Sequence, residues 1–187
     1  MMYYHNFLVD VSRYAELGKD NDFPELDCCP MCRARNRLQR HGFYERNAIE
    51  TEASTYRVTI CRLICPDCKK TVSILPTFLL PYFQHTLDFI IFILLAFWLT
   101  RSCLCTHQLR RFYERRAYGK QTEWTLFFRK EGYHQVLPKD PKEKAIKLLR
   151  MIQALGKATF VRRWWGHRIN SFMAHSLYHG ARVAKTE

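Results

Sequence analysis

Two Cys-Pro-x-Cys motifs divide the first half of this chain. They occupy residues 29–32 and 65–68, with 32 residues between them. Structural Zn²⁺ sites place four ligands at the corners of a tetrahedron, and each C-x-x-C turn delivers two thiolates to one metal ion. Two such turns joined by a hairpin would leave no open position for water. The spacing therefore predicts one structural Zn²⁺ bound by Cys29, Cys32, Cys65 and Cys68.

Strand-like segments lie between and after the two motifs. Residues 37–46 lead into a polar loop at 47–54, residues 55–64 favour a strand, and residues 72–75 offer a third short strand. We expect a small β zinc ribbon over residues 28–82, because bound metal contributes folding free energy to a module with a small core. A pair of redox-active dithiols is the alternative, but the order of strands and helices is unlike thioredoxin.

Four further cysteines have no assigned role. Cys28 adjoins a predicted ligand, and Cys61 could replace Cys65 in a C-x₃-C pairing. We interpret Cys103 and Cys105 as core or free thiols, since no second pair lies nearby. The start of the chain lacks the basic region and apolar core of a signal peptide. We therefore expect a cytoplasmic protein, in which metal binding or free thiols explain eight cysteines better than disulfides do.

The positive charge is concentrated in the second half. The formal net charge is +13, and residues 101–187 hold 19 Lys and Arg against 6 Asp and Glu. Residues 1–100 hold 11 Lys and Arg and 11 Asp and Glu. Within this half, residues 1–27 carry mainly acidic charge, and we interpret them as an acidic leader. The basic surplus of the second half favours nucleic acid as a partner, and an anionic membrane surface second. We expect duplex DNA and a nucleoid-associated location.

An apolar run at residues 89–99 separates the two halves. It has 11 residues, whereas a membrane-spanning helix needs about 20. Extending it backwards brings in Gln84, His85 and Asp88. We therefore predict a helix capped by Thr86 and buried at the centre of a helical cluster, and no membrane partner.

Residues 83–187 are predicted to form a basic helical domain, so the fold class is α+β. Within it, residues 106–131 resemble a helix-turn-helix, with a turn at 118–121 between two short helices. A helical bundle with a basic surface has the same pattern, and this alternative stays open. Two more helices are predicted at 141–155 and 160–177, the first opened by Asp140 and Pro141.

The expected DNA-contacting residues come from both parts of the chain. Residues near the start of the second helix of the helix-turn-helix would face bases, and basic side chains would contact phosphates. The full set is Arg33, Arg35, Arg37, Arg40, Arg110, Arg111, Arg115, Arg116, Lys120, Gln121, Thr122, Thr125, Arg129 and Lys130.

The order of these motifs resembles the zinc-ribbon domain at the N-terminus of some bacterial insertion-sequence transposases. The resemblance rests on both CPxC motifs, on the Arg-His-Gly-Phe-Tyr-Glu-Arg run at 40–46, and on the Leu-Pro-x-Phe-Leu-x-Pro-Tyr segment at 75–82. It is strongest to a family of short, uncharacterised transposase-like proteins in which a helix-turn-helix follows the ribbon. The resemblance implies DNA binding, at element ends or at an operator.

No catalytic set is visible. A metal-dependent transposase needs an RNase H-like domain whose carboxylates bind Mg²⁺, and no alternating strands surround the six carboxylates of the basic half. No Ser or Tyr recombinase pattern occurs either. The sequence therefore predicts a non-enzymatic, transposase-like recognition module. Three alternatives remain: a protein–protein adaptor for a transposase or transcription complex, an RNA-binding zinc ribbon, and, as the weakest, a membrane-associated protein that uses residues 78–99.

Overall fold

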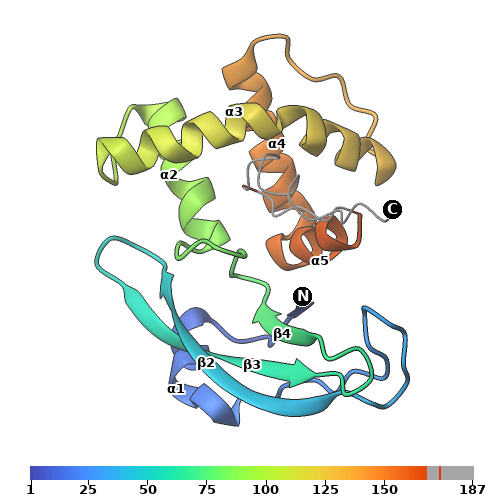
Figure 1. Ribbon diagram of the computed structural model, residues 1–187. Coiled ribbons are helices and arrows are strands. Elements are labelled where there is room, and N and C mark those ends of the chain that lie inside the picture. The colour runs from blue at the N-terminus through green and yellow to red at the C-terminus, as the bar shows by residue number, and fades with distance from the viewer. Residues whose placement is uncertain (168–172, 174–187) are drawn as a thin grey trace, which may run out of the picture. The chain divides into compact units, whose positions relative to one another are not determined.

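The computed structural model describes residues 1–167 and residue 173, and the chain divides into two compact units. We call Met1–Phe89 the sheet unit and Ile90–Glu187 the helical unit. The fold is mixed α+β, as predicted. Its elements are β1 (Met2–His5), α1 (Val11–Leu17), a 3₁₀ turn (Gly18–Asp20), β2 (Gln39–Ile49), β3 (Thr55–Ile64), β4 (Thr71–Pro76), α2 (Leu87–Thr100), α3 (His107–Lys130), α4 (Pro141–Leu155) and α5 (Lys157–His167) (Figure 1).

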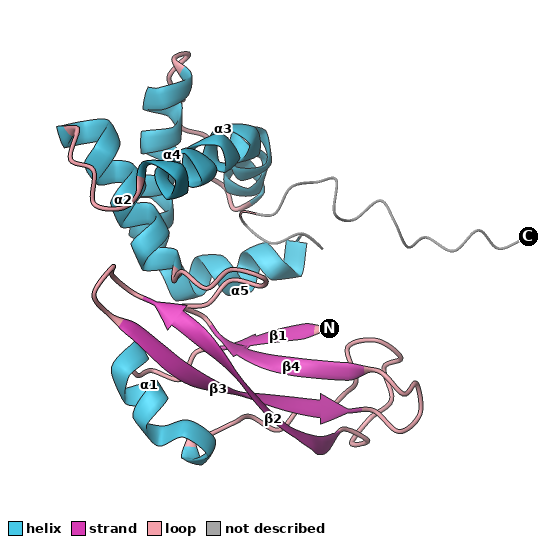
Figure 2. Cartoon of the chain, turned by 60° about the vertical axis from the view of Figure 1, so that its left-hand side comes forward, coloured by secondary structure: helices cyan, strands magenta, loops and turns pink. Residues whose placement is uncertain are grey.

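One four-stranded sheet, in the order β1-β4-β3-β2, organises the sheet unit (Figure 2). The predicted hairpin is confirmed: β2 and β3 pair antiparallel from Ile49 opposite Thr55 to Gln39 opposite Ile64. The register shifts between Arg40 and Gly42, which marks a bulge. β4 follows antiparallel to β3, so the chain segment after each CPxC motif enters the same sheet.

The predicted acidic leader is not a separate segment, because its apolar residues complete the sheet unit. β1 pairs in parallel with β4. Asp10 caps α1 by accepting a hydrogen bond of 2.7 Å from the backbone N–H of Arg13. Tyr14 is fully buried, and its hydroxyl donates to the carbonyl of Thr59 at 2.8 Å. The acidic side chains of residues 1–27 are exposed, whereas Tyr4, Val11 and Tyr14 are buried. The net negative charge of the segment therefore concealed the apolar residues that pack in the sheet unit.

Helix α2 agrees with its prediction in position but only partly in burial. The backbone N–H of Phe89 donates to the hydroxyl of Thr86 at 3.3 Å, which confirms the cap. Ile90 and Leu94 are buried, whereas Phe92 is 56% exposed. Among the described residues, no helix combines the length and the apolar character that crossing a membrane requires.

The predicted turn at residues 118–121 is wrong, because α3 runs unbroken for 24 residues. Its buried positions include Tyr113, Ala117, Gln121, Trp124 and Phe128, which repeat at the three- and four-residue spacing of one helical face. Packing along that whole face holds the helix together across an interior glycine, which costs only about 1 kcal/mol relative to alanine. Residues 106–131 are therefore not a helix-turn-helix.

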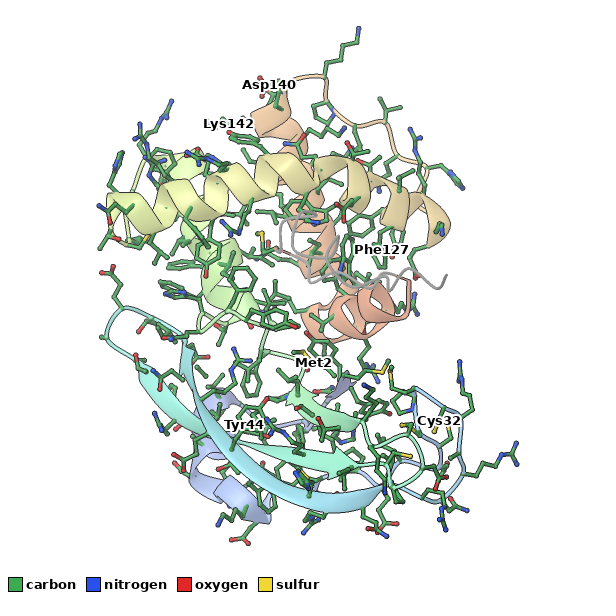
Figure 3. The ribbon with its side chains drawn as sticks, in the orientation of Figure 1. Met2, Cys32, Tyr44, Phe127, Asp140 and Lys142 are labelled. Atoms are coloured by element: carbon green, nitrogen blue, oxygen red, sulfur yellow. The ribbon has the colours of Figure 1, made fainter. Side chains whose placement is uncertain are left out.

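Aromatic side chains form the core of the helical unit. Phe127 of α3 lies edge-on to Phe160 of α5, with ring centroids 5.2 Å apart, and 5.5 Å from Trp164 (Figure 3). At the start of α4, Asp140 accepts from the backbone N–H of Glu143 at 2.8 Å, which confirms the predicted cap. The last predicted helix, 160–177, begins earlier, at Lys157, and its part beyond residue 167 lies outside the described residues apart from Met173.

Candidate metal centre

The two CPxC motifs fold into matching turns. In the first, the backbone N–H of Cys29 donates to the carbonyl of Ala34, and the N–H of Arg33 donates to the carbonyl of Cys29, both at 2.9 Å. In the second, Cys65 pairs in the same way with Lys70 and Lys69, at 3.0 and 2.9 Å. Each turn is thus closed by two backbone hydrogen bonds that involve the first cysteine of its motif. Both turns lie at one end of the sheet, where Figure 3 shows sulfur atoms gathered near Cys32.

The four predicted ligands come together in one group. The Sγ atoms of Cys29, Cys32, Cys65 and Cys68 all lie within 4.8 Å of one another. Cys29 lies 3.8 Å from Cys68, and Cys32 lies 3.7 Å from Cys65. A tetrahedron with Zn–S bonds of about 2.3 Å has sulfur atoms about 3.8 Å apart. The group therefore has the size of a four-thiolate zinc site.

The thiols of this group influence one another. The backbone N–H of Cys32 lowers the pKa of Cys29 to about 7. For Cys32, the backbone N–H of Ala34 favours the thiolate, but desolvation and the neighbouring sulfur atoms outweigh it and raise the pKa to about 12. Four thiolates at this separation repel one another unless a cation lies between them. The donor set thus suits a bound metal ion better than four free thiols.

The other cysteines lie outside this group. Cys61 is fully buried in β3, where burial raises the pKa of its thiol, so it does not replace Cys65 as a ligand. Cys28 is exposed although it adjoins Cys29. In the helical unit, Cys103 is exposed and Cys105 is buried. The interpretation of these two as free or core thiols agrees with their positions.

Basic side chains surround the metal centre. Arg33 and Arg35 are exposed, and Arg37 forms an exposed ion pair with Asp67 at 3.3 Å, which joins the two turns. Arg40 lies over the ring of Phe43, with 5.5 Å to the ring centroid. All four predicted arginines are thus at the surface, but Arg37 has an acidic partner that neutralises part of its charge.

A pocket of about 540 Å³ lies beside these turns, and the sequence offered no sign of it. Segment 23–27 forms one wall, and Arg40 and Cys61 lie on the sheet side. The carboxylates of Glu25 and Asp27 also line the pocket, so its polar groups carry both signs. Such mixed charge does not favour a phosphate group, and we assign the pocket no ligand.

The predicted contacts on α3 divide into buried and exposed residues. Arg110 is buried, lies over the ring of Phe97 at 3.8 Å and pairs with Glu114 at 2.7 Å. Lys120 is buried and pairs with Glu123 at 2.8 Å. These two residues, predicted as phosphate contacts, are therefore buried and paired with glutamates inside the helical unit instead.

The predicted base contacts divide in the same way. Gln121 is buried and donates to the carbonyl of Pro141 at 2.6 Å, and Thr125 bonds back to the carbonyl of Gln121 within the helix. Thr122 is exposed.

The other predicted phosphate contacts on α3 are mostly exposed. Arg116 is half-buried over the ring of Phe112 at 3.5 Å. The remaining exposed cationic residues of the predicted set on this helix are Arg111, Arg115, Arg129 and Lys130.

Comparison with known families gives one match. A family model described as a domain of unknown function (DUF6431) matches residues 29–111, from the first predicted ligand into α3. The match covers less than half of the chain, includes all four cysteines of the metal centre, and carries no functional description. No curated protein and no solved structure matches the chain.

Proposed function

We propose that this protein is a zinc-stabilised, non-enzymatic protein that binds duplex DNA, a transposase-like recognition module. One observation carries the proposal: Arg111, Arg115, Arg129 and Lys130 lie exposed on the same side of α3, and no acidic side chain among the described residues pairs with them. Cations that the fold leaves unneutralised are suited to an external polyanion. The net charge of +13 favours the same class of partner.

In this proposal the zinc ion has a structural role within a zinc ribbon. Cys29, Cys32, Cys65 and Cys68 would hold it, and four thiolates would leave no position for water or substrate. The ion would join the two ends of the hairpin and position Arg33 and Arg35 for phosphate contacts. The resemblance to transposase zinc ribbons supports this arrangement. The sheet unit would then add a second, smaller contact to that of α3.

A salt series of binding affinity tests the proposal. The variant Arg111→Gln/Arg115→Gln removes two unpaired cations, so the slope of log K against log salt should fall by nearly two, at about 0.9 counterion per phosphate contact. The matched control is Arg13→Gln/Arg57→Gln, which removes two exposed arginines that already pair with Glu16 and Glu45. Its slope should stay unchanged.

Two results would refute the proposal. One is the absence of duplex binding at low salt by the zinc-loaded chain. The other is an equal fall in slope for both double variants, which would mean that net charge alone determines binding. A smaller slope of log K against log salt for the α3 variant alone supports DNA binding by a defined surface on that helix.

A protein–protein adaptor is the second candidate function. Phe92 and Leu99 on α2 are 56% and 50% exposed, and their spacing places them on the same side of the helix. Exposed apolar side chains of this size suit a protein partner. Co-purification of a transposase or polymerase subunit that survives nuclease treatment and is lost in Phe92→Gln/Leu99→Gln would favour this function.

A further inference from the structure

The exposed side of α3 continues along the whole helix. Exposed residues recur at the three- and four-residue spacing that keeps them on one face. They are Gln108, Arg111, Phe112, Arg115, Tyr118, Gly119, Thr122, Leu126, Arg129 and Lys130. The helix has 24 residues, so this face is about 36 Å long at about 1.5 Å per residue. A face of this length can contact a larger surface of a partner molecule than a helix of two or three turns can.

Charge is distributed symmetrically along this face. Arg111 and Arg115 lie near its start, Arg129 and Lys130 lie at its end, and the part between them is uncharged. Arg115 and Arg129 are about 21 Å apart along the helix axis, at about 1.5 Å of rise per residue. The major groove of B-form DNA is about 12 Å wide and admits an α-helix. The two cationic pairs therefore flank the uncharged middle of the helix, which is the part that would enter the groove.

Gly119 lies in the middle of this face. It is exposed, and an added Cβ would meet no heavy atom within 4 Å. Packing among the described residues thus gives no reason for a glycine here, although glycine in a helix interior costs about 1 kcal/mol relative to alanine. Absence of a side chain lets the helix backbone approach another surface closely. Thr122, one turn later, is an exposed hydrogen-bonding residue on the same face.

We propose that α3 binds in the major groove of B-form DNA as one continuous helix, with Gly119 at the point of closest approach. In this arrangement Arg111 and Arg115 contact the phosphates of one strand, and Arg129 and Lys130 contact those of the other. Thr122 faces the base edges. The inference rests on the proposed function and specifies that the partner is a B-form duplex. A-form RNA is excluded as the partner, because its major groove is too narrow for a helix.

Two substitutions of Gly119 separate close approach from helix stability. Alanine and leucine have similar helix propensities, so G119A and G119L should stabilise α3 to a similar degree and differ only in bulk. G119L should bind a B-form duplex about tenfold more weakly than the wild type, whereas G119A should stay within about twofold. Binding is measured with the full-length, zinc-loaded chain, and far-UV circular dichroism checks that both variants remain folded.

A second arm compares duplex DNA with duplex RNA of the same sequence at equal salt. The expected result is preference for DNA by the wild type and loss of part of that preference in G119L. Equal affinity of G119L and G119A for DNA overturns the major-groove arrangement while leaving DNA binding intact. Equal affinity of the wild type for both duplexes also overturns it. No binding to either duplex refutes the proposed function itself.

Discussion

Arg33 and Lys69 hold the same backbone position in the two turns of the metal centre, each with a positive φ, of 63° and 57°. Each follows the second cysteine of its CPxC motif and donates its N–H to the carbonyl of the first cysteine. A residue with a Cβ in this conformation costs about 1–2 kcal/mol. The hydrogen bonds of the turn, and a bound metal ion, would offset that cost.

The conformation of Lys69 leads to the first prediction. Lys69→Val should destabilise the sheet unit by about 1–2 kcal/mol, because a β-branched residue tolerates positive φ poorly. Lys69→Gly should equal or slightly exceed the wild type. Guanidinium unfolding followed by circular dichroism measures both variants in zinc. The control is Lys70→Val, at an exposed neighbour without positive φ, and equal losses at the two positions would contradict the prediction.

Removal of one of the four predicted zinc ligands leads to the second prediction. Cys32→Ser should lower the bound zinc from one ion per chain to a small fraction, because a hydroxyl is a poor ligand for zinc at neutral pH. Cys28→Ser, at an exposed cysteine outside the group, is the matched control and should keep the full amount. Zinc is measured by elemental analysis after dialysis against a weak chelator. Equal zinc contents in the two variants would disprove a four-cysteine site.

The third prediction concerns Glu114, which accepts hydrogen bonds from Trp98 at 2.8 Å and from the buried Arg110 at 2.7 Å. Glu114→Ala should destabilise the helical unit by about 3 kcal/mol, since it leaves a buried guanidinium without its partner. Arg110→Met/Glu114→Leu should stay within about 1 kcal/mol of the wild type. Tryptophan fluorescence is a specific probe here, because all four tryptophans lie in the helical unit. A double variant as unstable as the single one would contradict this account.

The fourth prediction concerns pH. Burial lowers the pKa of His85, whose ring stacks on Phe89 at 5.2 Å. The unfolded chain therefore binds a proton at a higher pH than the folded chain does. Stability from this residue should be fully present above pH of about 6.5 and decline as the pH falls below it. His85→Phe, which keeps a stacking ring, should flatten the decline seen by circular dichroism between pH 7 and 5. His41→Phe, at an exposed histidine, should leave the decline unchanged.

Local signals in the sequence were sufficient for several elements. The loop between β2 and β3, the start of β3 and the caps of α2 and α4 agree with the structure. Each depends on residues close together in the chain, such as a cap and the N–H three residues later. The two cysteines of each CPxC motif are also close together in the chain. Their spacing predicted four thiols in one group, which the structure confirms.

Tertiary packing decided what local signals could not. Gly119 between two polar residues indicated a turn, yet the apolar face from Tyr113 to Phe128 packs as one surface and keeps α3 continuous. The same packing buries Arg110, Lys120 and Gln121, which composition alone placed among the basic surface groups.

Pairing between distant segments also decided the structure of the N-terminal residues, which composition did not reveal. Their acidic composition concealed β1 and α1, which join the sheet unit through β4 and through Tyr14. The sequence by itself thus determined the group of four cysteines that could bind a metal, the hairpin, and the caps of α2 and α4, because those depend on short spacings. Only the tertiary structure decided which polar side chains are buried, because burial depends on the segments that pack against each face.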